Sequence, residues 1–513
     1  MRVLFVFTLN DVQSADRPLR TPEILQLGIA YISALLKSHG HDTRLVVLSR
    51  VFEKQMPRLL DKTLKGWEPS LVCFYSVSSE YRFVREVRAE IARRLPQARQ
   101  VIGGPHASLD PQGVISDYDA VCIGEGEHAV LEYVTQLEKG GEPSGIGNLW
   151  IRRGTEIERN PQRPFYQTVD ELPFPDRDIW YPWIDEEPSA KPTVLLGRGC
   201  PFQCTYCCHH AFRNLGSGAY VRFRSPANIV AEIDAVVKRW PKYREIYLEQ
   251  ETIGVKAKWS QDLCDALEEY NKTRAVPLTF GVNLAVTPTI DFDALFAALK
   301  RANVRYVNMG LESGSERLRR DILRRKYSNE DMIKAVDAAK RHGLKVAIFN
   351  MIGLPTETPE EFEETVAVNR RCMPDWNYTS IFYPYPGTDL HRLCQEKGLL
   401  KGADGGPVAI DMERSQATLD LPTFPRKQVQ RAYEWFDYRV YEGHKPKYRL
   451  LAKVVRSKVK TRPRLNRFFR LLTRSPLGAG IQQLFNPFVE RLSPVGSGEQ
   501  MAIPEVTPVA EPL

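Results

Sequence analysis

The sequence predicts an α/β protein of several domains: an N-terminal doubly wound domain, a partial barrel of six β/α repeats and a C-terminal helical region. Strand-like apolar runs alternate with helix-like spacing along the first 130 residues, resume near residue 190 and stop near residue 400. A chain of 513 residues is also too long for one hydrophobic core. We therefore expect domains at 1–140, 191–400 and 401–490, a linker at 141–190 and a disordered tail at 491–513.

The N-terminal domain is predicted to contain five parallel strands. Each candidate is a short Val, Ile, Leu or Phe run, as in sheets that are buried on both faces. The strands are expected at residues 2–8, 43–48, 71–76, 100–103 and 120–123, with crossover helices at 24–37 and 81–94. This order is typical of a flavodoxin-like sheet, whose ligand binds at the carboxyl ends of the strands.

Those strand ends are rich in small and polar residues. They predict a binding site formed by Ser76, Gly103, Gly104, His106, Gly124, Glu125, Gly126 and Glu127. The first strand is not followed by a G-x-G-x-x-G turn, so a dinucleotide is disfavoured as the ligand.

The second alternation predicts a barrel-like parallel sheet. Its strands are expected at 193–196, 245–248, 278–282, 306–309, 345–349 and 378–382. Six repeats are fewer than the eight of a full TIM barrel, so the barrel is expected to be partial, with its active site at the carboxyl ends of the strands.

The charge of the chain is unevenly distributed. The formal net charge is +8, yet residues 445–474 contain twelve basic and no acidic side chains, so the rest of the chain is net negative. Leucine, valine and phenylalanine interleave with these basic residues, a pattern that favours an anionic membrane surface; a solvated helix packed on the barrel is the alternative. No apolar run reaches membrane-spanning length and residues 1–7 look like a strand rather than a signal peptide, which indicates a cytoplasmic protein, in contact with the inner membrane surface if residues 445–490 bind there.

Four of the nine cysteines lie within nine residues, directly after the first barrel strand. Cys200, Cys204 and Cys207 have the spacing with which thiolates on one loop hold an iron-sulfur cluster, leaving one iron open to a substrate or cofactor. Zinc is the alternative, although no second C-x-x-C pair lies at finger spacing. Cys208 is expected to pack as a small buried hydrophobe.

This C-x-x-x-C-x-x-C loop, with Tyr206 before its last cysteine, resembles the signature of radical S-adenosylmethionine (SAM) enzymes. The turns at 310–314, 351–357 and 384–388 resemble the cofactor-side turns of that superfamily. The resemblance implies that SAM is bound by Tyr206, Glu249, Glu251, Gly310, Glu312, Ser313 and Gly353. Two departures are Glu249-Gln250-Glu251, where the family often has two aspartates, and Asn283, where an arginine is frequent.

The N-terminal domain sharpens this resemblance. Residues 27–41, 101–108 and 123–127 are similar to the cobalamin-binding domain that precedes the barrel in cobalamin-dependent radical SAM enzymes. The likeness covers about residues 1–400. No D-x-H-x-x-G motif is present, so the resemblance implies cobalt without a protein imidazole, and His106 is expected at the edge of the cofactor.

The resemblance implies three cofactors, a [4Fe–4S] cluster, SAM and cobalamin, and an external electron donor of the flavodoxin or ferredoxin type. The leading hypothesis is methylation of an unactivated carbon in a lipid or secondary metabolite. Cyclisation or rearrangement with the same cofactors, RNA modification and a non-catalytic cobalamin sensor stay open. Nucleic acid is not the expected partner, because the first domain has only Cys73 and Cys122 and lacks the further cluster cysteines of methylthio-transferring relatives.

Overall fold

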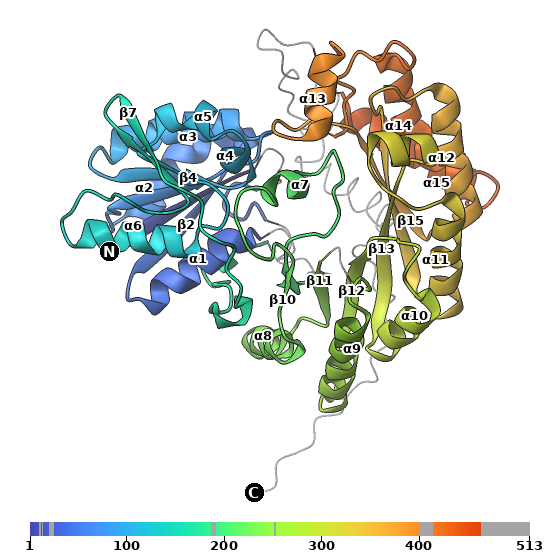
Figure 1. The fold of residues 1–513 in the computed structure, drawn as a ribbon, viewed down its shortest axis with the longest axis horizontal. Coiled ribbons are helices and arrows are strands. Elements are labelled where there is room, and N and C mark those ends of the chain that lie inside the picture. Colours follow the sequence, from blue (N-terminus) through green and yellow to red (C-terminus); the bar gives the residue numbers. More distant parts are fainter. Residues whose placement is uncertain are drawn as a thin grey trace, which may run out of the picture.

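A computed structural model describes residues 1–9, 12, 14–19, 25–185, 191–250, 253–400 and 414–462. Two α/β domains lie side by side, and the C-terminal helices pack beside the second of them (Figure 1). Glu251, the expected tail at 491–513 and the basic segment beyond Arg462 lie outside the described residues.

The N-terminal sheet confirms the doubly wound prediction. Its parallel strands run in the order β2-β1-β3-β4-β5, which is the flavodoxin-like order. The strands are β1 (Arg2–Leu9), β2 (Asp42–Ser49), β3 (Leu71–Tyr75), β4 (Arg99–Gly103) and β5 (Ala120–Cys122). The helices are α1 (Leu27–Ser38), α2 (Met56–Leu64), α3 (Tyr81–Arg94), α4 (Pro105–Leu109), α5 (Pro111–Val114) and α6 (Glu127–Glu138). The central strands are buried on both faces, which is why they are almost entirely apolar.

The stretch that we expected to be a linker begins with a hairpin. Strands β6 (Leu149–Arg153) and β7 (Glu156–Arg159) extend the first sheet in antiparallel fashion beyond β5. Gly154 has φ +62° in the turn between them. The hairpin was not predicted, because a hairpin at the edge of a sheet faces solvent and carries charges. The long apolar runs of the central strands are therefore absent from its sequence.

The second domain is a partial barrel of six parallel strands in the order β15-β14-β13-β12-β11-β8. They are β8 (Thr193–Leu195), β11 (Glu245–Glu249), β12 (Thr279–Leu284), β13 (Val304–Glu312), β14 (Lys345–Ile352) and β15 (Trp376–Ile381). The predicted partial barrel is therefore confirmed, and its strand ends carry the residues that the sequence analysis singled out.

Helices cover the outside of the barrel (Figure 1). They are α8 (Pro226–Arg239), α9 (Ala257–Lys272), α10 (Phe292–Arg301), α11 (Asn329–Arg341) and α12 (Pro359–Cys372), with a π-helical turn at Leu318–Ile322. Ser328 and Thr358 begin α11 and α12 with capping boxes, in which the third residue of each helix returns the hydrogen bond.

Between β8 and β11 in the sequence lies a small two-stranded ladder. It consists of β9 (Gly197–Arg198) and β10 (Arg222–Phe223), and the loop between them contains all the clustered cysteines and the short helix α7 (Cys208–Phe212). We call residues 199–221 the cysteine loop. In Figure 1, α7 lies between the two domains.

The described C-terminal part is helical, as expected. It contains α13 (Asp389–Glu396), α14 (Arg426–Tyr441) and α15 (Lys447–Lys460), and α14 packs against α12 and β15. Within the described residues, no helix combines the length and the hydropathy that crossing a bilayer would need.

Candidate active site at the domain interface

Two glycines close the base of the cysteine loop. A Cβ on Gly197 would lie 2.3 Å from the carbonyl oxygen of Arg222, and one on Gly199 would lie 2.1 Å from that of Tyr220. Gly199 also has φ +81°. Only glycine lets β9 and β10 approach this closely, so the loop returns on itself within a short distance of its origin.

The three predicted ligands share one neighbourhood. Cys200 is buried, whereas Cys204 and Cys207 are partly exposed, and the amide of Cys207 donates to the carbonyl of Cys204 at 3.1 Å. Burial raises the pKa of Tyr220, with further increases from Cys208, Cys200 and Cys207. Burial and then Glu312 raise the pKa of Tyr206, and Cys204 and Cys207 add smaller increases. The thiols therefore lie within electrostatic reach of two tyrosines of the same loop.

This arrangement fits a cluster by the chemistry of its donors. Among the described residues, no three His, Cys, Asp or Glu side chains converge as a single metal ion would require. Cysteines that ligate different irons of one cluster need not converge on a point, and three soft thiolates on one loop are the donors that iron-sulfur clusters prefer.

Tyr206 joins the loop to the end of β13. Its hydroxyl donates to Glu312 Oε1 at 3.1 Å, and Arg325 Nη1 donates to the Tyr206 oxygen at 2.9 Å and to Glu312 Oε1 at 3.2 Å. Burial first, and then the charge of Glu312, raise the pKa of Tyr206, which stays protonated. Glu312 has φ +64°, a backbone conformation that residues other than glycine rarely adopt. The neighbouring residues hold it in this conformation.

Gly310 and Ser313 flank this network. A Cβ on Gly310 would lie 2.4 Å from Glu312 Oε1, so the glycine makes room for the folded-back carboxylate. The carbonyl of Gly310 accepts hydrogen bonds from Arg325 Nη2 at 2.9 Å and Tyr327 at 2.6 Å. Ser313 is fully buried, and its amide donates to the carbonyl of Leu311. Arg325 and Tyr327 were not predicted as site residues, because neither lies in a strand-end motif.

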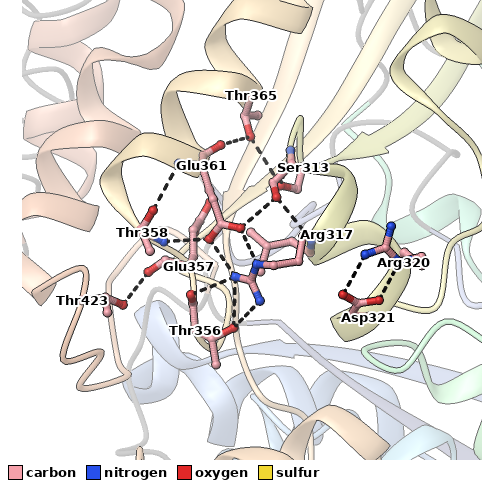
Figure 2. A network of polar contacts seen from close by, with 12 residues as sticks. Ser313, Arg317, Arg320, Asp321, Thr356, Glu357, Thr358, Glu361, Thr365 and Thr423 are labelled. Carbon is pink, nitrogen blue, oxygen red and sulfur yellow. Dashed lines mark hydrogen bonds and ion pairs between the residues drawn. The ribbon is translucent and has the colours of Figure 1, made fainter.

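The turn after β14 surrounds a buried carboxyl group. Glu357 Oε2 accepts the amides of Gly353 at 2.5 Å and Leu354 at 3.0 Å, and Oε1 has no hydrogen-bond partner within the described part of the chain. Burial raises the pKa of Glu357 to about 8 in spite of these two donors. Figure 2 shows Glu357 beside Glu361, which pairs with Arg317 from the segment after β13.

The end of β11 is described only in part. Burial raises the pKa of Tyr247, and the charge of Glu249 raises it further. Glu251 lies outside the described residues. Gln250 was passed over in the sequence analysis. It is buried, and neither of its amide atoms has a hydrogen-bond partner among the described residues, although its nitrogen lies close to Gly197. Burial of an unsatisfied amide is costly, so this side chain is suited to a ligand.

The structure brings together the predicted residues at the carboxyl edge of the first sheet. The amide of Ser76 donates to the carbonyl of Gly103 at 3.0 Å, and the amide of His106 donates to the carbonyl of Ser76 at 3.1 Å. Gly104 has φ +96°, and a Cβ there would meet the Ser76 carbonyl at 2.8 Å. The amide of Gly124 donates to Ser108 Oγ at 3.0 Å, which ties the next strand end to this edge.

His106 lies in the short helix α4 at this edge. Its Nδ1 lies 3.1 Å from Ser78 Oγ, its ring lies 4.3 Å from that of Tyr81, and its Nε2 has no hydrogen-bond partner among the described residues. Burial lowers the pKa of His106, so the ring is neutral near pH 7. A neutral buried ring with one unsatisfied nitrogen fits the edge of a large polar cofactor.

This edge faces the cysteine loop. Helix α4 of the first domain contacts α7, and a Cβ on Gly387 after β15 would lie 2.9 Å from the Leu109 side chain. Leu215 of the cysteine loop packs against the core of the first domain. Burial and then the charge of Cys208 raise the pKa of Tyr75 at the end of β3. The two predicted sites therefore meet at the domain interface.

Glu125 and Glu127 form ion pairs across that interface. Arg198 Nη2 donates to Glu127 Oε1 at 2.5 Å, and Arg198 Nη1 donates to Glu125 Oε1 at 3.3 Å. Arg222 Nη1 pairs with the same Glu125 oxygen at 2.8 Å. Both carboxylates, which the sequence analysis assigned to the cofactor, thus have arginine partners from the second domain.

Comparison with known proteins agrees with this architecture. The B12 binding domain family matches residues 21–134 and the radical SAM superfamily matches residues 194–368. The chain is 28% identical over 389 residues to "Uncharacterized methyltransferase PH0819" of Pyrococcus horikoshii, covering 73% of this chain and 79% of that protein. It is 25% identical over 411 residues to the anaerobic magnesium-protoporphyrin IX monomethyl ester cyclase of Rubrivivax gelatinosus, covering 77% and 70%.

The fold is shared with a solved structure. The radical SAM methyltransferase TsrM of Kitasatospora setae, with cobalamin and a [4Fe–4S] cluster bound, superimposes with a TM-score of 0.64 at 16% identity, covering 87% of this chain and 89% of that chain. The chain therefore joins a B12 binding domain to a domain of the radical SAM superfamily, and these two domains imply cobalamin, SAM and a [4Fe–4S] cluster as its cofactors.

Proposed function

We propose that this enzyme transfers a methyl group to an unactivated carbon of a small molecule or lipid. The observation that carries the proposal is the contact between the carboxyl edge of the first sheet and the cysteine loop, through α4 and α7. When bound, the cluster and SAM supply a carbon-centred radical on the substrate, and cobalamin supplies the methyl group that this radical takes up. The site for cobalamin and the site for the cluster and SAM must both reach the same substrate, so the two sites have to lie close together.

For the cluster, the proposed ligands are Cys200, Cys204 and Cys207. The tight base at Gly197 and Gly199 supports this assignment, because it limits how far the loop can move. The carbonyl of Cys200 also accepts a hydrogen bond from Arg213 at 2.8 Å, which fixes the first ligand against the end of α7.

For SAM, the proposed residues are those that the sequence analysis selected in the cysteine loop and at the expected ends of the barrel strands. They are Tyr206, Glu249, Glu251, Gly310, Glu312, Ser313 and Gly353, to which we add Gln250. The linked hydrogen bonds of Tyr206, Glu312 and Arg325 hold a carboxylate in place, and a fixed carboxylate suits the ammonium group of a methionine moiety.

For cobalamin, the proposed residues are Ser76, Gly103, Gly104, His106 and the turn 124–127. The unsatisfied Nε2 of His106 supports a polar contact there. In this turn we assign Gly124 and Gly126 and the main chain of Glu125 and Glu127 to the cofactor, because the two carboxylates join the first domain to Arg198 and Arg222 of the second.

Anaerobic turnover with SAM labelled in its methyl group tests the proposal. With the cluster reconstituted, cobalamin added and a flavodoxin or ferredoxin as the reductant, we expect deoxyadenosine together with a product that carries the label. The variant Cys204→Ala is expected to abolish both, whereas Cys264→Ala, at a buried cysteine of α9, retains them. If deoxyadenosine forms but the product has lost hydrogen and carries no label, the proposed methylation is wrong and cyclisation is the reaction.

We also propose that α15 places the enzyme on an anionic membrane surface. Tyr448, Leu451 and Val455 follow helical spacing and are 45–60% exposed, whereas Leu450 and Val454 on the other side are buried. Exposed basic residues, among them Lys447 and Arg456, border the apolar stripe. An apolar stripe bordered by cations is the pattern of helices that lie in the headgroup region.

Co-sedimentation with vesicles tests this surface. Vesicles with anionic headgroups are expected to bind the full chain more strongly than neutral vesicles, and Leu451→Ser with Val455→Ser is expected to weaken that binding. Val276→Ser is the matched control, because Val276 is 51% exposed but lies in the segment between α9 and β12. Equal binding by the double variant and the wild type would remove the proposal and favour a substrate that is not a membrane lipid.

A further inference from the structure

The base of the cysteine loop places two like charges opposite each other. Strands β9 and β10 pair with Arg198 opposite Arg222, and the loop runs from one arginine to the other. Both side chains are largely buried. Like charges that face each other across a ladder destabilise the pairing, so this base needs compensation from elsewhere.

The compensation comes from the other domain. One carboxylate oxygen, Glu125 Oε1, lies 3.3 Å from Arg198 Nη1 and 2.8 Å from Arg222 Nη1, so it bridges the two arginines. Glu127 Oε1 accepts from Arg198 Nη2 at 2.5 Å. Two positive charges in the second domain are therefore balanced by two negative charges from one turn of the first.

The surroundings make this pairing strong. The side chain of Glu127 is only 6% exposed, and the Arg198 guanidinium lies 5.1 Å from the ring centroid of Tyr31 in α1. Burial alone would raise the pKa of Glu127, yet the charge and the hydrogen bond of Arg198 leave it below its ordinary value. Arg198 is thus enclosed by the first domain although it stands two residues before Cys200.

We propose that Glu125 and Glu127 are positioning residues. From the cobalamin-binding domain, they hold β9 and β10 together at the base of the cysteine loop. The proposal rests on the proposed function in one respect, that this loop holds the cluster. It accounts for how the ligand loop keeps a fixed place against the carboxyl edge of the first sheet. Loss of either carboxylate leaves buried arginines unbalanced and lets the ladder open.

A matched ion pair on the same helix provides the control. Glu132 lies in α6, as Glu127 does, and pairs with an arginine, Arg163. Arg163 belongs to the segment between the domains and not to the cysteine loop. Glu132→Gln therefore removes a more exposed carboxylate–arginine pair from the same helix and leaves the partners of Arg198 and Arg222 in place.

Alkylation of Cys200 in the full-length protein without its cluster tests the proposal. Cys200 is buried, so its rate of reaction with iodoacetamide, followed by mass spectrometry of peptides, reports opening of the loop. Glu127→Gln is expected to raise that rate by about tenfold or more, because removal of one partner from a buried pair is strongly destabilising. Cys73 in β3 and Cys264 in α9, one buried cysteine in each domain, are expected to keep their rates, and so is Cys200 in Glu132→Gln.

Two further variants separate positioning from general destabilisation. Arg198→Gln in the Glu127→Gln background replaces a broken ion pair by two amides and is expected to restore part of the protection of Cys200. Glu127→Asp keeps the charge and is expected to lie closer to the wild type than Glu127→Gln. A wild-type rate at Cys200 in Glu127→Gln, or an equal rise at Cys73 and Cys264, would overturn the proposal.

Iron release gives a second readout on the reconstituted enzyme. We expect an Fe²⁺ chelator to remove iron faster from Glu127→Gln than from Glu132→Gln. Neither measurement requires methyl transfer. If the enzyme proved to catalyse another reaction with the same cofactors, the proposed function would fail while the alkylation result stood.

Discussion

Nη1 of Arg325 donates a hydrogen bond of 2.9 Å to the hydroxyl oxygen of Tyr206, across 119 residues of sequence. The same nitrogen lies 3.2 Å from Glu312 Oε1, to which the Tyr206 hydroxyl also donates. The cysteine loop is thereby joined to the end of β13 by three buried polar groups that satisfy one another. Networks of this kind hold a site in one geometry, because a member that moves away gives up the hydrogen bonds it makes to the others.

Glu312→Gln is expected to weaken SAM binding by about tenfold, the effect of a lost charge-assisted hydrogen bond. Tyr206→Phe, which removes a hydroxyl but keeps the ring, is expected to have a smaller effect. Anaerobic equilibrium dialysis of SAM with the reconstituted enzyme measures both. Glu330→Gln, an exposed carboxylate in the first turn of α11, is the control. Wild-type affinity in Glu312→Gln would contradict the assignment of this carboxylate to SAM.

Glu357 is expected to make the enzyme less stable as the pH rises. Burial raises its pKa from 4.5 to about 8, so between these values the unfolded chain releases a proton that the folded chain keeps. Its contribution is complete below pH 4.5 and declines towards pH 8, by up to about 1.4 kcal/mol per pH unit. We expect the midpoint of urea unfolding to fall from pH 6 to pH 8 in the wild type and to fall less in Glu357→Gln. Equal slopes in the two proteins would show that Glu357 is ionised in the folded state.

Gly199→Ala is expected to impair assembly of the cluster. The residue has φ +81°, and a Cβ there would lie 2.1 Å from the backbone oxygen of Tyr220, which cannot move without separating β9 from β10. Gly218→Ala is the matched control in the same loop. It has φ +85°, but its nearest neighbour is the flexible side chain of Gln167 at 3.1 Å. Both substitutions place an alanine at a positive φ, which costs about 1–3 kcal/mol in each case. A difference in iron content after reconstitution therefore measures the clash with the Tyr220 backbone. Equal iron content would mean that the ladder tolerates widening.

Glu232→Gln is expected to destabilise the barrel by about 3–5 kcal/mol, because it leaves two buried cations with weakened partners. Glu232 is 1% exposed and accepts hydrogen bonds of 2.5 Å from Arg177 and from Arg224. Asp234→Asn on the same helix breaks an exposed pair with Lys238 and is expected to cost less than about 1 kcal/mol. Urea unfolding of the full chain compares them, and a similar loss in both variants would contradict the role of burial.

Much of the fold could be predicted, because parallel strands that are buried on both faces must be continuous apolar runs. The strand order of the first sheet and the six strands of the partial barrel agree with those runs. The hairpin of β6 and β7 was missed, since a hairpin at the edge of a sheet faces solvent and needs no apolar run. After β7, Ile179, Trp180, Trp183 and Ile184 pack into the core of the first domain.

The site was predicted where residue type and spacing are local. The cysteine spacing, the glycine turns and the small residues after β3, β4 and β5 lie close together in the chain. Arg325, Tyr327 and Gln250 were missed because their roles come from burial beside distant segments. Glu125 and Glu127 were assigned to a cofactor because nothing in the sequence pairs them with arginines about 70 residues or more away.

The chain by itself determined the order of domains, the place of the clustered cysteines and the kind of cofactors, because these depend on the periodicity of apolar residues and on short motifs. Only the tertiary structure decided which strand ends face each other and which charges balance Arg198 and Arg222. Ion pairing between domains depends on distance in space and on burial, and neither quantity is encoded in the spacing of two residues along the chain.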